Sequence, residues 1–176
     1  MSRFLLRICL ALLVPVCVAA QPQEEVARYG LHGVRAVYVV IQDLQEDLVK
    51  DGLLTETLRS EMKQLVQAGG LEVFVVEDPL DEPLVQGTLR LTIQATTVSS
   101  MNRIYCVRIE FRQRANLTRD PSIGLVATTW QASDIGLSPL KDMTEIHGAV
   151  RDLMARFLAD CQQANPDPPK NTERDN

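Results

Sequence analysis

Apolar and polar residues alternate with a period of two at two places in the chain, which predicts strands with one buried and one exposed side. The two stretches are 88–95 and 103–113. Their apolar sides consist of Leu89, Leu91, Ile93, Ala95, Tyr105, Val107, Ile109 and Phe111. Their polar sides consist of Thr88, Arg90, Thr92, Gln94, Cys106, Arg108, Glu110 and Arg112. Strands of this kind belong to a sheet that buries one face and leaves the other in water.

Three further segments are predicted to be strands because they are rich in β-branched and other apolar residues. They are 34–41, 71–77 and 125–132, the last of which holds Trp130. In 34–41 the apolar residues fall on both sides of the strand, which is typical of a strand near the middle of a sheet. A loop is predicted at 116–124, where the pair Asp120-Pro121 provides turn chemistry.

Two segments carry apolar residues at helical spacing. The first, 55–68, can be capped by Thr55 and ends at Gly69-Gly70, and the second is 142–161. The apolar stripes are Leu58, Met62, Leu65 and Val66 in the first helix, and Ile146, Val150, Leu153, Phe157 and Cys161 in the second. Segment 44–54 is expected to be a connector, with a helical turn as an alternative.

The element order, β-α-β-β-β-β-α, predicts an α+β fold. The strand-helix-strand unit over 34–77 favours a right-handed crossover with its two strands parallel. The three later strands follow one another as antiparallel neighbours. We therefore expect a two-layer sandwich, in which an about five-stranded mixed sheet carries two helices on one face.

The first twenty residues have the pattern of a signal peptide. Arg3 and Arg7 form a positively charged start, 8–18 is apolar, and Ala19-Ala20 supplies the small residues that a leader peptidase reads. Cleavage after Ala20 would deliver a periplasmic or secreted protein. No later segment is long and uncharged enough to be expected as a membrane span.

The mature chain is expected to be a single domain with two loose ends. A flexible N-terminal arm is predicted at 21–32, one α+β domain at 33–161, and a disordered polar tail at 162–176. Lipid attachment at Cys17 is not expected, because Val16 replaces the small residue that usually precedes an acylated cysteine.

The charge balance disfavours a nucleic-acid partner. The full chain has 18 basic and 23 acidic residues and a net charge of −5. Loss of Arg3 and Arg7 with the leader leaves 16 basic residues against 23 acidic ones, so the mature net charge is near −7. A hydrophobic content of 45% is that of a globular protein rather than a disordered one.

Cys106 and Cys161 are the two cysteines that remain after the leader is removed. An oxidising compartment favours one disulfide between them. The strand pattern opposes it, because Cys106 lies on the polar side of its strand while Cys161 belongs to the apolar stripe that faces the other side of the sheet. A disulfide and two separate thiols therefore both stay open.

The common catalytic and cofactor motifs do not occur in the chain. The quartet from Ser60 to Lys63 matches Ser-x-x-Lys, but Met62 places it in mid-helix and the companion motifs of penicillin-recognising enzymes are missing. His32 and His147 have no metal-ligand spacing around them. We expect a protein that is not an enzyme and has no metal or cofactor. The alternative is an enzyme of an unrecognised family that uses Cys106 or His147.

Three arginines, Arg90, Arg108 and Arg112, share the polar side of the sheet in this acidic protein, and Arg103 and Arg114 lie near the strand ends. The guanidinium group offers a rigid fork of donors suited to phosphate or carboxylate, so this face is a candidate binding site for an anion. The alternative is an ordinary solvated strand face on which Glu110 neutralises the arginines.

Over 34–161 the order of elements, the leader and the lack of catalytic residues resemble the small envelope-accessory domains of Gram-negative bacteria, such as the lipopolysaccharide-assembly lipoprotein. The resemblance implies a noncatalytic module that docks on a larger envelope complex or carries an anionic glycolipid. We expect a periplasmic or secreted binding or assembly-accessory protein of the cell envelope. Its partner would be an envelope protein or an anionic envelope component, bound through the sheet face or an exposed strand edge.

Overall fold

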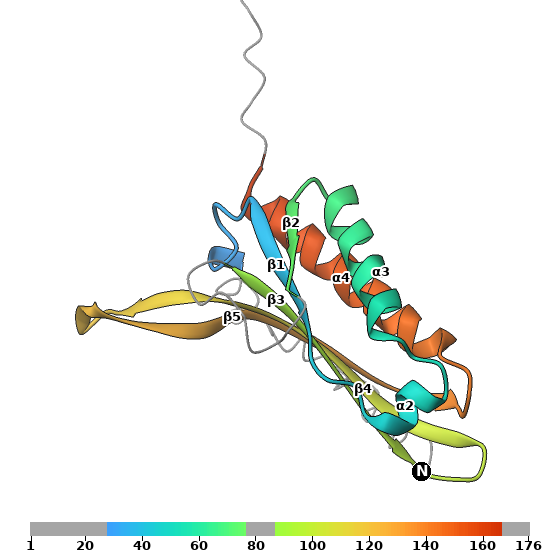
Figure 1. The fold of residues 1–176 in the computed structure, drawn as a ribbon. Helices are drawn as coiled ribbons and strands as arrows, with labels where there is room; N and C mark the ends of the chain where they lie inside the picture. The colour runs from blue at the N-terminus through green and yellow to red at the C-terminus, as the bar shows by residue number, and fades with distance from the viewer. Residues whose placement is uncertain (1–27, 77–86, 167–176) are drawn as a thin grey trace, which may run out of the picture.

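The structure is a computed structural model that describes residues 28–76 and 87–166. Their strands form one sheet, accompanied by helices on one side (Figure 1). The elements in chain order are β1 (Ala36–Ile41), α2 (Glu46–Lys50), α3 (Thr55–Ala68), β2 (Glu72–Val75), β3 (Thr88–Thr97), β4 (Asn102–Leu117), β5 (Asp120–Pro139) and α4 (Thr144–Ala164). The predicted α+β class and the order of strands and long helices are confirmed.

The sheet is five-stranded and mixed, with the order β2-β1-β3-β4-β5. β1 pairs in parallel with β2 and β3, whereas β3, β4 and β5 are antiparallel neighbours. The parallel pair β1–β2 arises because α3 returns the chain to the same end of the sheet. β1 is therefore an inner strand, and Val37, Val39 and Val40 are buried although they point to both of its sides.

α3 and α4 lie side by side on one face of the sheet (Figure 1). Their fully buried apolar residues include Leu58, Met62, Val66, Ile146, Val150, Met154 and Phe157. The Phe157 ring lies 5.1 Å from Trp130 of β5 and 5.7 Å from Phe111 of β4, measured between ring centroids. Full burial of one such side chain contributes about 1.5–3 kcal/mol, so the apolar stripes hold both helices on this face.

The connector 44–54 contains the short helix α2 and a tight turn. Gly52 has a φ of 104°, a conformation that L side chains rarely adopt, and it allows the chain to turn between the buried residues Leu48 and Leu53. The turn places Asp51 beside Arg103, whose guanidinium donates to the Asp51 carboxylate. Arg103 is only 1% exposed, so it lies on the covered side of the sheet and not with the polar-face arginines.

The hairpin of β4 and β5 is longer than the sequence predicts. The expected loop at 116–124 is largely strand, because β4 continues to Leu117 and β5 starts at Asp120. β5 also runs on to Pro139, seven residues past the predicted end at 132. β3 pairs with β4 only as far as Arg112, so the remainder of the hairpin projects from the sheet as a two-stranded ribbon (Figure 1).

The ordered fold also extends slightly beyond the predicted boundaries at 33 and 161. α4 continues to Ala164, and the Asn165 side chain then links it to the segment before β1. The Asn165 Oδ1 atom accepts a hydrogen bond of 2.6 Å from the Gly33 N–H, and Nδ2 donates one of 2.9 Å to the Leu31 carbonyl. Leu31 is fully buried, so residues 31–33 belong to the domain.

The expected signal peptide at 1–20, most of the expected arm and residues 167–176 of the expected tail lie outside the described residues. Among residues 28–76 and 87–166, none of the helices has the length and apolar character needed to cross a membrane.

Candidate functional site

The face of the sheet opposite α3 and α4, called the open face here, carries the polar sides of β3 and β4. Tyr105 and Phe111 are buried towards the helices, whereas Arg108 on the alternate parity is exposed, as the strand pattern predicts. The register extends this face onto β5. Its residues on the three strands are Thr88, Arg90, Thr92, Gln94, Ile104, Cys106, Arg108, Glu110, Arg112, Gln131, Ser133, Ile135 and Leu137.

The three predicted binding arginines come together on the neighbouring strands β3 and β4 of the open face. Arg90 pairs directly with Glu110 across β3 and β4. Arg108 and Arg112 stand two residues to either side of Glu110 on β4, so each is a diagonal neighbour of Arg90. The cluster thus brings three arginines and one glutamate together in a chain with a net charge of −5.

The arginines are close enough to affect one another. Partial burial, and after it the positive charge of Arg112, lower the pKa of the Arg90 guanidinium from its ordinary value, while the charge of Glu110 opposes the shift. An arginine stays charged at neutral pH even so. The like-charge repulsion in the cluster would be relieved by a bound anion.

An apolar patch adjoins the arginine cluster at the end of the open face near the β3–β4 turn. Ile104 pairs with Leu137, and Cys106 pairs with Ile135, across β4 and β5. The exposed fractions are 44% for Ile104, 70% for Ile135 and 62% for Leu137. Two further exposed apolar side chains, Val98 and Met101, lie at the turn itself. The open face therefore combines an arginine cluster with an apolar end.

A small pocket lies where the open face meets the outer edge of β5. It has a volume of about 380 Å³ and is lined by Arg108, Gln131, Ala132, Ser133 and Arg156. Arg108 comes from β4, whereas Arg156 comes from α4 on the helical layer. The pocket therefore adds a fourth arginine, from the other layer of the protein, to the positive surface.

The candidate disulfide between Cys106 and Cys161 is absent, because both thiols are free. Cys106 is half-buried on the open face, whereas Cys161 is buried in α4 on the covered side. Burial, and to a lesser extent the neighbouring Asp160 carboxylate, raise the pKa of Cys161 to about 12. Its thiol is therefore protonated and poorly reactive at neutral pH.

His147 of α4 contacts Glu61 of α3 and so links the two long helices. Its Nδ1 atom lies 2.6 Å from the Glu61 Oε2 atom of α3, and Glu61 also meets Arg151 at 3.5 Å. His147 is thus on the helical layer and Cys106 on the open face, so these two alternative working groups do not share a site. Within the part of the chain that the structure describes, His, Cys, Asp and Glu side chains form no group of three suited to a metal.

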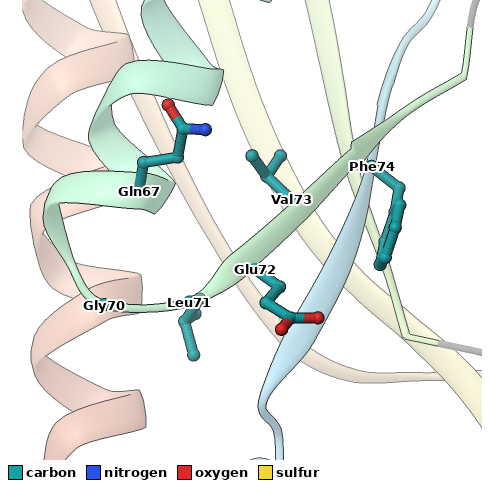
Figure 2. Close-up of a pocket in the computed structure, with 6 residues that line it drawn as sticks. All are labelled: Gln67, Gly70, Leu71, Glu72, Val73 and Phe74. Atoms are coloured by element: carbon teal, nitrogen blue, oxygen red, sulfur yellow. The ribbon is translucent and has the colours of Figure 1, made fainter.

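The other hollows lie at the opposite edge and along the helices. One of about 540 Å³ follows the turn from α3 into β2, with Gln67 on the last turn of the helix and Phe74 farther along the strand (Figure 2). Glu72 is its one charged lining residue. Beside it, the Tyr38 and Phe74 rings stack with centroids 5.0 Å apart. This hollow gathers neither opposing charges nor a nucleophile with a base. The hollow along the helices, of about 570 Å³, does gather opposing charges, because it is lined by Glu56, Thr57, Ser60, Glu61, Gln64, His147 and Arg151.

The sequence pattern placed Arg90, Arg108 and Arg112 correctly on one face, but it did not find Ile135, Leu137 or Arg156. The apolar pair was missed because the predicted strand ended at residue 132. The signal past 132 is the alternation of Ile135 and Leu137 with polar or small residues, although these two fall on the opposite parity from Trp130 and Ala132. No local signal points to Arg156, which reaches the β5 edge through the packing of α4 on the sheet.

Neither a protein-family model nor a curated protein matches the chain. Among solved structures, a dodecameric PelC variant from Paraburkholderia phytofirmans is similar with 17% identity and a TM-score of 0.42, over 74% of this chain and 90% of that one. A minor lipoprotein from Acinetobacter baumannii is similar with 9% identity and a TM-score of 0.33, over 76% of this chain and 92% of that one. Both TM-scores are below 0.5 and establish neither a common fold nor a common function.

Proposed function

We propose that this protein is a noncatalytic binding module of the cell envelope that uses its open face to engage an anionic amphiphile, such as the surface of an anionic lipid layer. The observation that carries the proposal is the placement of an arginine cluster, in which Arg108 is exposed and Arg90 and Arg112 are half-buried, beside an exposed apolar patch on one face of the sheet. The expected leader supports an envelope location.

The electrostatic support is the contrast between the open face and the whole molecule. Arg90, Arg108 and Arg112 concentrate positive charge on one side of an acidic protein, which orients that side towards a negative surface. A basic residue near an anionic lipid surface contributes about 1 kcal/mol of attraction. Three such residues therefore supply affinity that salt should weaken.

The apolar support is the exposure of several large apolar side chains on the open face. Their exposure to water does not stabilise the fold. Contiguous exposed apolar patches mark interaction sites, whereas single exposed apolar residues need no explanation. Ile104, Ile135 and Leu137 are cross-strand or diagonal neighbours and so form a contiguous surface. An amphiphile presents both chemistries that the open face offers.

The alternative of an enzyme that uses Cys106 or His147 has less support. Catalysis by either group needs a partner that activates it. Glu61 is such a partner for His147, since it meets Nδ1 and orients the ring, whereas the nearest charged neighbours of Cys106 along β4 are arginines and not a base. Activity screening of the unaltered protein beside Cys106→Ser and His147→Ala would detect such a role. We expect no activity that either substitution abolishes.

Vesicle flotation tests the proposed function. The full chain should bind phosphatidylglycerol vesicles more tightly than neutral phosphatidylcholine vesicles, and less tightly at high salt. Replacing Arg90, Arg108 and Arg112 together by Gln should weaken binding about tenfold or more. Changing Ile135 and Leu137 to Ser should weaken it as well, because apolar contact is lost.

Matched control variants distinguish an effect of the open face from a general effect of lost charge or lost apolar area. Lys50→Gln, Lys63→Gln and Arg119→Gln together remove the same charge from exposed positions elsewhere, and Ile123→Ser with Leu125→Ser alters the projecting ribbon. Both controls should bind like the unaltered protein. Equal loss in the controls, or no loss in the open-face variants, would show that the open face is ordinary surface.

A further inference from the structure

The pocket at the β5 edge is built by two layers of the protein. Arg108 stands opposite Ser133 in the β4–β5 register, and both residues line the pocket. Arg156 approaches from α4, on the other side of β5, where Ala132 is equally small. The pocket thus brings one arginine from each layer together with two small residues of β5.

The position of Arg156 is set by the packing of the residues that follow it on α4. Asp160, one helical turn later, accepts a hydrogen bond of 2.8 Å from the indole Nε1–H of Trp130 on β5. Phe157 packs its ring against the same indole at 5.1 Å. These contacts fix this turn of α4 over the strand that carries Gln131 to Ser133, so the pocket does not depend on a loop.

The lining of the pocket has the chemistry of an anion site. Two guanidinium groups supply charge and forked donors, and the Gln131 amide and the Ser133 hydroxyl add neutral donors. The volume of about 380 Å³ lies within the range of roughly 300–1,000 Å³ typical of small-ligand sites.

We propose that this pocket binds the phosphate group of a phosphorylated ligand, with Arg108 and Arg156 as its two charged donors. A phosphate monoester carries about −1.5 to −2 charges and matches two guanidinium groups better than a single carboxylate does. The inference rests on the proposed function and deepens it, because it assigns one subsite of the anionic surface and adds a residue from the helical layer.

Titration with inorganic phosphate tests the subsite directly. The backbone amides of Gln131 and Ser133 in ¹⁵N-labelled full-length protein should shift saturably with phosphate and not with chloride. Arg108→Gln and Arg156→Gln should each weaken the binding about tenfold or more, the usual effect of losing a charge-assisted pair. Arg156→Lys should retain part of the affinity, because it keeps the charge but loses the fork.

Arg119→Gln, which removes an exposed arginine from the β4–β5 turn, is the matched control and should leave phosphate binding unchanged. Amide spectra of all variants report whether each one is folded. Shifts that do not saturate, or an Arg156→Gln variant that binds phosphate as the Arg119→Gln variant does, would overturn the assignment of the pocket.

Phosphatidic acid vesicles and free phosphate together identify the source of the phosphate. Loss of affinity of Arg156→Gln for phosphatidic acid vesicles assigns a lipid headgroup, and loss for free phosphate alone assigns a soluble phosphorylated ligand. No loss in either arm overturns the inference. Phosphatidylglycerol binding that still depends on Arg90, Arg112 and the apolar patch would leave the proposed function standing, so the two failures are distinguishable.

Discussion

At the scale of single residues, strand parity places the Cys106 thiol and helical spacing places the Cys161 thiol. Cys106 lies on the open face and Cys161 in the core, so the sheet itself separates them. The sequence contained both halves of this conclusion, namely the alternation on 103–113 and the helical stripe. Only the expected oxidising compartment favoured a disulfide. An oxidising compartment does not join two cysteines that the fold holds on opposite sides of the sheet.

The buried thiol makes stability depend on alkaline pH. The folded pKa of Cys161 is about 12 against an ordinary value of 9.0, so its contribution is complete below pH 9 and is lost between pH 9 and 12. In that window the unfolded chain loses the proton first. Denaturant unfolding of wild-type and Cys161→Ala protein at pH 8 and pH 10.5, in reductant, should show a smaller pH effect in the variant.

Above pH 9, the free energy of unfolding of the wild-type protein should fall more steeply than that of Cys161→Ala, by about 1 kcal/mol per pH unit. Cys161→Ala also leaves a cavity, but that cost is the same at both pH values and cancels from the comparison. Parallel losses of stability in the two proteins would mean that Cys161 ionises in the fold as it does in the unfolded chain.

At the scale of elements, β5 shows what alternation can and cannot predict. Trp130 and Ala132 mark the buried side up to 132, but Ser133, Asp134 and Gly136 are residues typical of turns. The strand continues through them because β4 offers a full-length partner, a tertiary effect that propensity does not contain. The projecting ribbon was missed for the same reason. Residues 116–124 have the composition of a loop, and most of them are in strands because β4 and β5 pair with each other almost to the turn.

Gly136 is required within β5 by the ring opposite it. A Cβ atom there would lie 2.4 Å from the Tyr105 hydroxyl oxygen. Gly136→Ala should therefore force the Tyr105 ring to shift and should lower the free energy of unfolding by about 1–3 kcal/mol. Chemical denaturation measures the change.

Gly148→Ala is the control for this substitution. It lies within α4 with open space around the added Cβ, so it should raise the stability by up to about 1 kcal/mol through helix propensity. If the two substitutions had the same sign, the close contact between β5 and the Tyr105 ring would not be the cause of the first effect.

At the scale of the whole molecule, the two-layer arrangement creates the candidate site. Helix stripes and strand alternation are local patterns, and they predicted the covered face, the open face and the arginines on it. The pocket at the β5 edge depends on where α4 crosses the sheet, which Trp130, Phe157 and Asp160 determine through long-range packing. The exposed patch likewise depends on the unforeseen end of β5.

Cys106 is a built-in reporter of the open face, because it lies between the arginine cluster and the apolar patch. The measurement is the rate of maleimide labelling at Cys106, followed by mass spectrometry of its peptide, with and without phosphatidylglycerol vesicles. Binding through the open face predicts that these vesicles slow the labelling of Cys106 and that phosphatidylcholine vesicles do not. An unchanged rate on protein that floats with the vesicles would contradict the account.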